Sequence, residues 1–217
     1  VALLDHDDIL ADNALYWVAR ELQQKPQANL VYSDEDKISD DGMRACPHFK
    51  PAFNIDLLLS YNFISHLGVY RREILKQIGG FRVGFEGSQD HDLALRTVLE
   101  SSPDQIIHIP RVLYHWRAHS GSTASNPNSK DYTTESGHRA VQHYLDEQHR
   151  RGGIKATARI KARNRFTCEW HIPEKPPSVE LIIPTRDQAE VLNLAVDSII
   201  TKTTYTNYTI TIVDLSL

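Results

Sequence analysis

The sequence predicts an α/β fold, in which short buried strands alternate with amphipathic helices. Two apolar segments, residues 1–4 and 29–33, have the length and composition of buried strands, and acidic residues follow each of them. Near the other end of the chain, residues 179–213 repeat the order strand, helix, strand. This order favours a parallel sheet, and thereby an α/β architecture.

The composition is that of a folded protein of between one and two domains. The chain has 217 residues, of which 41% are hydrophobic, and a formal net charge of −4. The mild acidity argues against a nucleic-acid-binding protein, and no uncharged apolar run is long enough to cross a membrane. No signal peptide opens the chain. Cys46 and Cys168 form neither a metal-binding nor a disulfide pattern, which indicates a reducing compartment, the cytoplasm.

The first half of the chain is expected to contain a strand at 1–4, a helix at 12–24, a strand at 29–33, a loop at 39–53, a helix at 54–61, a strand at 66–71 and a helix at 72–77. Leu15, Val18 and Leu22 give the first helix one apolar face, and Pro26 follows its end. Gly79 and the glycine after it close the last helix of this half.

The second half is expected to contain a glycine-containing loop at 84–88, a helix to residue 100, a strand at 106–114, a loop at 120–129, a helix at 132–150, a half-exposed strand at 154–172, a strand at 179–183, a helix at 188–201 and a strand at 209–213. Ser88 is suited to cap the first of these helices, and Pro103 follows its end. Residues 174–177 (EKPP) have the composition of a linker.

Acidic residues follow the two predicted strands of the first half. Asp5, Asp7 and Asp8 lie within four residues of one another, and Asp34 and Asp36 follow the second strand. Ligands of α/β proteins bind at the carboxyl ends of strands, and carboxylate oxygens suit Mg²⁺ or Mn²⁺. The alternative is a solvated acidic turn that caps the next helix.

Two further clusters carry groups suited to acid–base chemistry and anion binding. Asp90 falls in the first turn of its predicted helix, where the helix dipole favours an ionised carboxylate that can accept a proton from a hydroxyl. His115, Arg117 and His119 follow the strand at 106–114. Imidazoles bind metals, and a guanidinium binds phosphates through two bonds. The alternatives are helix capping for Asp90 and an ordinary strand end for the second cluster.

Taken together and in this order, these segments resemble the family 2 glycosyltransferases of the GT-A fold. The resemblance covers about residues 1–124 and rests on residues 3–8 (LLDHDD), 29–37 (NLVYSDEDK), 49–51 (FKP), 79–82 (GGFR) with 86–96 (EGSQDHDLALR), and 114–119 (YHWRAH). The second and third of these segments are similar to bacterial surface-polysaccharide members. Many members have Glu before the presumed base, where this chain has Gln89.

The end of the chain resembles the beginning of the same family. Residues 179–187 (VELIIPTRD) and 208–214 (YTITIVD) are similar to its first β-α-β unit. The resemblance therefore implies the C-terminal part of one GT-A domain at 1–173, a linker at 174–178 and the N-terminal β-α-β of a second, truncated domain at 179–217. The fold expected is a partial, Rossmann-like GT-A fold with a mixed sheet plus this unit. The apolar ends and the lack of an initial Met also indicate a fragment.

The resemblance implies metal-dependent, inverting transfer from a nucleotide sugar to a glycan or lipid-linked glycan, in O-antigen-like or capsule-like surface polysaccharide assembly. Peripheral association with the inner face of the membrane is expected of such a protein. The resemblance implies that Mg²⁺ or Mn²⁺ is bound by Asp5, Asp7, Asp8 and His115, and that the base is Asp90. It implies that substrate or diphosphate is bound by Arg117, His119, Gln89, Asp34 and Asp36. The nucleotide of the second module would be bound by Thr185, Asp187 and Asp214.

Two other classes of function stay open. The chain could be a non-catalytic or inactive truncated scaffold, because the first module would lack its nucleobase-binding half. A phosphohydrolase of the haloacid dehalogenase type also uses Asp-x-Asp after a strand. That class requires Thr or Val where this chain has Ile9, and it leaves residues 114–117 (YHWR) without a role.

Overall fold

A computed structural model describes residues 1–117 and 131–215, so the predicted loop at 120–129 lies outside the described residues. The chain divides into two compact units, Val1–His171 and Ile172–Leu217, and each is described by itself. The elements of the first unit are β1 (Ile9–Leu10), α1 (Ala14–Gln24), β2 (Leu30–Ile38), β3 (Arg44–His48), α2 (Ile55–Ser60), β4 (Gly68–Tyr70), α3 (Arg72–Ile78), α4 (Gln89–Leu99), a 3₁₀ turn (Pro103–Gln105), β5 (Ile106–Arg117), α5 (Asp131–Arg150), β6 (Ala156–Ala162) and β7 (Arg165–Trp170).

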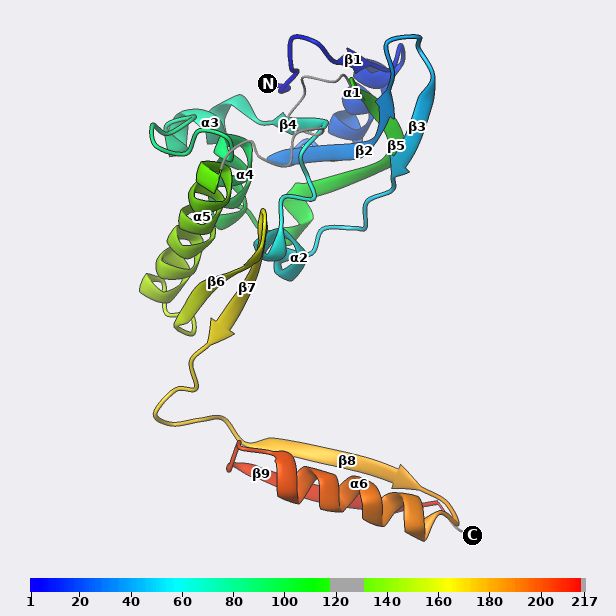
Figure 1. Ribbon diagram of the computed structural model, residues 1–217, viewed down its shortest axis with the longest axis vertical. Helices are drawn as coiled ribbons and strands as arrows, with labels where there is room; N and C mark the ends of the chain where they lie inside the picture. Colours follow the sequence, from blue (N-terminus) through cyan, green and yellow to red (C-terminus); the bar gives the residue numbers. More distant parts are fainter. Residues whose placement is uncertain (118–130, 216–217) are drawn as a thin grey trace. The chain divides into compact units, whose positions relative to one another are not determined.

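The first unit is built on a mixed five-stranded sheet, as the sequence predicts for an α/β fold. Its order is β1-β5-β2-β3, and β4 also pairs with β2 (Figure 1). Strands β2 and β5 are parallel, whereas β1, β3 and β4 run antiparallel to their neighbours. Strand β4 borders the first half of β2 and β3 borders the second half. The central position of β2 explains why most of its residues are buried.

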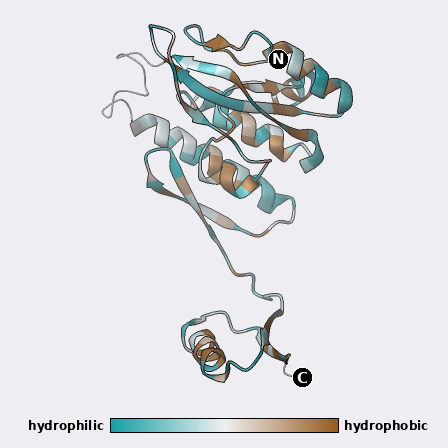
Figure 2. Cartoon of the chain, turned by 90° about the vertical axis from the view of Figure 1, so that its right-hand side faces the viewer, coloured by the Kyte–Doolittle hydropathy of each residue, from teal (hydrophilic) through white to brown (hydrophobic). Residues whose placement is uncertain are grey.

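Helices cover both faces of this sheet. Successive side chains of a strand point to opposite faces, and Leu30 and Tyr32 accordingly belong to one core cluster while Val31 belongs to the other. The Leu30 cluster includes apolar residues of α2, α4, α5, β6 and β7, and the Val31 cluster includes Ala14 and Val18 of α1. Figure 2 colours the chain by hydropathy, and brown segments occur on strands and helices of this unit.

Some sequence predictions for the first unit are wrong. Residues 1–4 form a single bridge, Ala2 to Val69, beside the short strand β4, and they are mostly exposed instead of forming a buried strand. The expected loop at 39–53 contains β3, which forms a hairpin with β2. The expected single strand at 154–172 is the hairpin β6–β7, which turns at Asn164 with a φ of 51°, a conformation that Asn tolerates.

The remaining predicted elements of this unit are present, with ends that differ by a few residues. Asn54 caps α2 by accepting a hydrogen bond from the Leu57 N–H at 2.9 Å. Gly79 ends α3 in the left-handed conformation that glycine adopts without strain. Ser88 occupies the cap position of α4, but its hydroxyl donates to the Thr133 carbonyl instead of capping the helix.

The second unit is the predicted β-α-β unit: β8 (Val179–Thr185), α6 (Ala189–Lys202) and β9 (Tyr208–Asp214). Its two strands are parallel and pair from Val179–Tyr208 to Thr185–Asp214. Several apolar side chains of α6 are exposed, among them Leu194. Within residues 1–117 and 131–215, no helix combines the length and the apolar character needed to cross a membrane.

Candidate functional site

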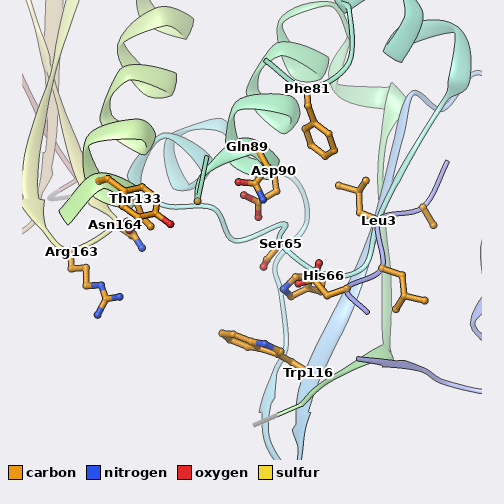
Figure 3. Close-up of a pocket in the computed structure, with 15 residues that line it drawn as sticks. Leu3, Ser65, His66, Phe81, Gln89, Asp90, Trp116, Thr133, Arg163 and Asn164 are labelled. Atoms are coloured by element: carbon orange, nitrogen blue, oxygen red, sulfur yellow. Dashed lines mark hydrogen bonds between the residues drawn. The ribbon is translucent and has the colours of Figure 1, made fainter. Parts of the chain in front are cut away.

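A cavity of about 700 Å³ lies in the first unit, where segments distant in sequence meet (Figure 3). They are the N-terminal segment, the loop before β4, the loop before α4 with the first turn of that helix, the end of β5, the start of α5 and the β6–β7 turn. Asp5, His66, Gln89, Asp90 and Trp116 all line it. The cavity therefore contains candidate residues of the first acidic cluster and of the α4 start, together with Trp116, which lies between the candidates His115 and Arg117.

Asp5, Asp8 and His66 form a candidate metal centre at this cavity. Each offers one ligand atom, and these atoms lie within 4.8 Å of one another. The Asp8 N–H donates to the Asp5 carbonyl at 3.3 Å, which holds the two acidic residues in one turn. The His66 ring stacks on Tyr114 with centroids 4.6 Å apart. Two carboxylates and an imidazole form a donor set that fits a divalent cation such as Mn²⁺.

The Asp8 carboxylate is held in place by the end of β5. One oxygen accepts a hydrogen bond from the Tyr114 hydroxyl, and the other accepts the Arg117 N–H at 2.7 Å. Burial and the adjacent Asp8 raise the pKa of Tyr114 above its ordinary value, so the hydroxyl stays protonated and acts as a donor. The Arg117 guanidinium donates from Nε to the Asp7 carbonyl at 2.7 Å, which places Arg117 beside the same turn.

The structure places two of the sequence-predicted metal ligands elsewhere. The Nδ1 atom of buried His115 lies 2.5 Å from the Asp36 carboxylate, within the sheet. Asp7 is not part of the Asp5–Asp8–His66 group, and its carboxylate faces His6 at 3.8 Å. His66 carries no metal-ligand signal in the sequence, because only the fold brings the loop before β4 beside the turn at Asp5. His119 lies outside the described residues.

Asp90 opens toward the cavity from the first turn of α4. Its Oδ2 atom accepts a hydrogen bond from the Asn62 side-chain amide at 2.8 Å. The next residue, His91, points into the core, where its Nε2 lies 2.8 Å from the Leu58 carbonyl. Burial lowers the pKa of His91, so that the ring is neutral and donates to this carbonyl. Gln89 is exposed and lines the cavity beside Asp90.

Asp34 and Asp36, the two other acidic candidates, are buried inside β2. Asp34 accepts the Lys50 N–H at 2.9 Å and contacts His108 at 2.8 Å. The Asp36 carboxylate accepts a hydrogen bond from Arg44 Nε at 2.7 Å and contacts Nδ1 of His115. These partners explain why β2 continues through its acidic residues to Ile38, whereas the sequence predicts a strand that ends at residue 33. Neither carboxylate lines the cavity.

Between Asp34 and Asp36, Glu35 faces a buried lysine. Lys50 Nζ lies 3.6 Å from Glu35 Oε2, and its side chain has no exposed surface. Burial lowers the pKa of Lys50 to about 8. Burial also acts to raise the pKa of Glu35, but a hydrogen bond with His48 and the nearby positive charges of Lys50 and His66 hold it below its ordinary value.

In the second unit, the three nucleotide-site candidates gather at one end of the β8–β9 pair. Thr185 and Asp214 are paired residues at the carboxyl ends of the two parallel strands. Asp187 follows two residues after Thr185 and has a φ of 52°. This end of a parallel pair is where α/β folds bind ligands.

Two known proteins resemble almost the whole of this chain, and no family model matches it. "Uncharacterized protein y4gI" of Sinorhizobium fredii (strain NBRC 101917 / NGR234) is 42% identical over 215 residues, which are 99% of this chain and 23% of that protein. "O-antigen biosynthesis protein RfbC" of Myxococcus xanthus is 36% identical over 213 residues, 98% of this chain and 16% of that protein. The chain thus spans less than a quarter of the length of either relative.

Proposed function

We propose that this chain contains the metal-binding residues and the general base of a metal-dependent, inverting glycosyltransferase of surface polysaccharide assembly. Its donor would be a nucleotide sugar, and its acceptor a glycan or lipid-linked glycan. One observation supports this most strongly: a single cavity is lined by Asp5, a member of the candidate metal centre, and by Asp90 at the start of α4. The name of the Myxococcus relative supports the biological setting.

Asp5, Asp8 and His66 are the residues that would hold Mg²⁺ or Mn²⁺. When bound, the cation would offset the negative charge that develops on the departing nucleotide diphosphate. Arg117 lies beside the Asp5–Asp8 turn through its bonds to Asp7 and Asp8, and its guanidinium carries charge suited to the same diphosphate.

Asp90 would act as the general base. It would take the proton of an acceptor hydroxyl while that oxygen forms a bond to C1 of the donor sugar. The bond from C1 to the diphosphate oxygen would break on the opposite face, so the configuration at C1 inverts and the electron pair leaves with the nucleotide. Asn62 holds Oδ2 of Asp90, which leaves Oδ1 to receive the proton.

The remaining lining of the cavity suits sugar rings. Phe81, Tyr132 and Trp116 offer aromatic surface, while Ser65 and Asn164 offer polar groups. The volume of about 700 Å³ is within the range of pockets for small organic ligands, roughly 300–1,000 Å³. For the second unit, we propose that Thr185, Asp187 and Asp214 contribute to a nucleotide site of their own.

The proposal is tested by calorimetric titration of nucleotide sugars, with and without Mn²⁺, into the natural protein that contains this chain. The expected result is Mn²⁺-dependent binding, lost in Asp5→Asn and Asp8→Asn, together with sugar transfer to a glycan acceptor. Phosphate release without transfer would favour the phosphohydrolase, and the absence of both binding and transfer would favour the scaffold. Either of these results would overturn the proposal.

A further inference from the structure

We propose that buried Lys50 and Glu35 are positioning residues for the loop of residues 62–66, and that through this loop they set the places of both His66 and Asp90. The inference deepens the proposed function, because it assumes that these two residues serve the same site. Lys50 and Glu35 do not line the cavity themselves. Their proposed role is to fix the backbone that does.

Lys50 holds the carbonyl side of the loop. Its Nζ donates to the Ile64 carbonyl at 2.7 Å and to the His66 carbonyl, and it lies 3.6 Å from Glu35. An ammonium group without solvent contact is costly to bury, and it is tolerated where carbonyls and a carboxylate surround it. Both backbone carbonyls that accept a hydrogen bond from Lys50 Nζ therefore belong to one short loop.

Glu35 holds the amide side of the same loop. Its Oε2 atom accepts the His66 N–H at 3.3 Å, and its Oε1 atom faces His48 Nδ1 at 3.2 Å. The N–H and C=O groups of His66 are therefore bound by the two members of one buried ion pair. With its backbone fixed, the His66 ring is directed to its stack on Tyr114, near Trp116 and the carboxylates of the candidate metal centre.

The beginning of the loop reaches the other half of the site. Asn62 accepts the Ser65 N–H on its Oδ1 at 3.1 Å and donates from Nδ2 to Asp90 at 2.8 Å. One five-residue segment thus contacts the proposed base at one end and supplies a metal-ligand candidate at the other. A buried ion pair adds little net stability compared with apolar residues of similar size, whereas it fixes hydrogen-bonded groups in place. The pair therefore fits a positioning role.

Lys50→Met tests the inference, because Met keeps an unbranched side chain and removes the donor. Glu35→Gln is the second variant, since it removes the charge while keeping the side chain's shape. The matched control is Arg96→Met. Arg96 is another buried cation that binds two backbone carbonyls and a carboxylate, those of Ile78, Gly80 and Asp92. Its hydrogen bonds go to none of residues 62–66.

Two measurements are made on each variant. One is the Mn²⁺ dissociation constant by calorimetry, and the other is the ring-proton NMR shift of His66, assigned with His66→Gln. Lys50→Met should weaken Mn²⁺ binding by about tenfold or more, as loss of a residue that orients a metal ligand does. It should also change the chemical shifts of the His66 ring protons, because the ring would leave its stack on Tyr114. Glu35→Gln should do so to a smaller extent. Arg96→Met should lower the urea midpoint and leave both measurements unchanged.

The outcomes separate this inference from the proposed function. If the wild-type protein binds Mn²⁺ and Lys50→Met and Glu35→Gln bind it equally well with an unmoved His66 signal, the inference is overturned and the metal centre stands. If the wild-type protein binds no Mn²⁺ but the His66 signal moves in Lys50→Met and Glu35→Gln and not in Arg96→Met, the metal centre fails and the positioning role stands. Equal effects in Arg96→Met would reduce the result to general loosening and overturn the inference.

Discussion

Asn62 donates a hydrogen bond from Nδ2 to Oδ2 of Asp90 at 2.8 Å, across 28 residues of sequence. This bond occupies one oxygen of the carboxylate, and in the proposed mechanism the other would receive the proton of the acceptor hydroxyl. The same Asn62 side chain accepts the Ser65 N–H, so that the carboxylate is linked to the loop carrying His66. The two chemical roles proposed for the cavity thus share a physical connection.

Asn62→Ala should lower the turnover number of sugar transfer by about tenfold, or about 1.4 kcal/mol, because a hydrogen bond to a charged group is lost. The KM for the nucleotide sugar should change little, since Asn62 acts through Asp90. Steady-state kinetics measure both. Asn54→Ala is the control: it removes the α2 cap and should cost about 1 kcal/mol of stability without slowing transfer. Equal turnover in wild type and Asn62→Ala would contradict the account.

The structure and the sequence make different predictions for the metal ligands, and substitution distinguishes them. Asp5→Asn, Asp8→Asn and His66→Ala should each weaken Mn²⁺ binding by more than about tenfold, because each removes a member of the candidate centre. His115→Gln should instead lower the unfolding midpoint, because it breaks a buried contact with Asp36.

Calorimetric titration of Mn²⁺ measures these affinities, with Asp7→Asn as the comparison variant. Asp7→Asn should weaken binding less than Asp5→Asn does. Loss of binding in Asp7→Asn and His115→Gln, with full binding in His66→Ala, would support the arrangement expected from the sequence and contradict the one described by the structure.

The buried imidazole of His91 should make the fold sensitive to acid. Burial lowers its pKa below the ordinary value of 6.5, so below that pH the unfolded chain takes up a proton that the folded chain does not. The contribution of neutral His91 to the free energy of unfolding is therefore fully present above pH 6.5. It falls as the pH decreases, by up to about 1.4 kcal/mol per pH unit. Urea unfolding between pH 5 and 7.5 should show a smaller fall in His91→Gln, and parallel curves for the two proteins would refute this.

Gly87 and Gly84 form a matched pair for testing the packing at the cavity edge. Both have positive φ, 79° and 92°, but a Cβ on Gly87 would lie 2.6 Å from a Thr133 carbon, whereas one on Gly84 meets nothing within 4 Å. Gly84→Ala should cost about 1 kcal/mol from backbone strain. Gly87→Ala should cost about 3 kcal/mol and also displace cavity-lining Thr133. Thermal unfolding measures both, and equal costs would contradict the packing described.

Local patterns were sufficient to predict most of the elements of this fold. The apolar face of α1 and the Gly79 stop are properties of neighbouring residues, and each leaves a signal in the sequence. Strand β3 left no such signal, because its residues are mostly exposed and it exists only by pairing with β2. The sequence predicts too early an end for β2, because three acidic residues normally indicate a strand end. Their partners Lys50, His108 and His115 come from later segments of the chain.

The candidate site was predictable to the extent that its residues lie in short motifs. Asp5, Asp8 and Asp90 were found from strand-end and helix-start positions, and the cavity brings Asp5 and Asp90 together. His66, Asn62 and Lys50 were not assigned roles, because their significance depends on contacts between the loop before β4 and segments remote in sequence.

The most direct test of the central claim is the effect of Asp90→Asn on sugar transfer in the natural protein that contains this chain. Asparagine keeps the size of the side chain and its contact with Asn62, but it cannot accept the hydroxyl proton. The account predicts a fall in turnover of roughly 10²–10⁴-fold, with Mn²⁺-dependent nucleotide-sugar binding retained. Transfer by Asp90→Asn at a rate near that of the wild type would contradict it.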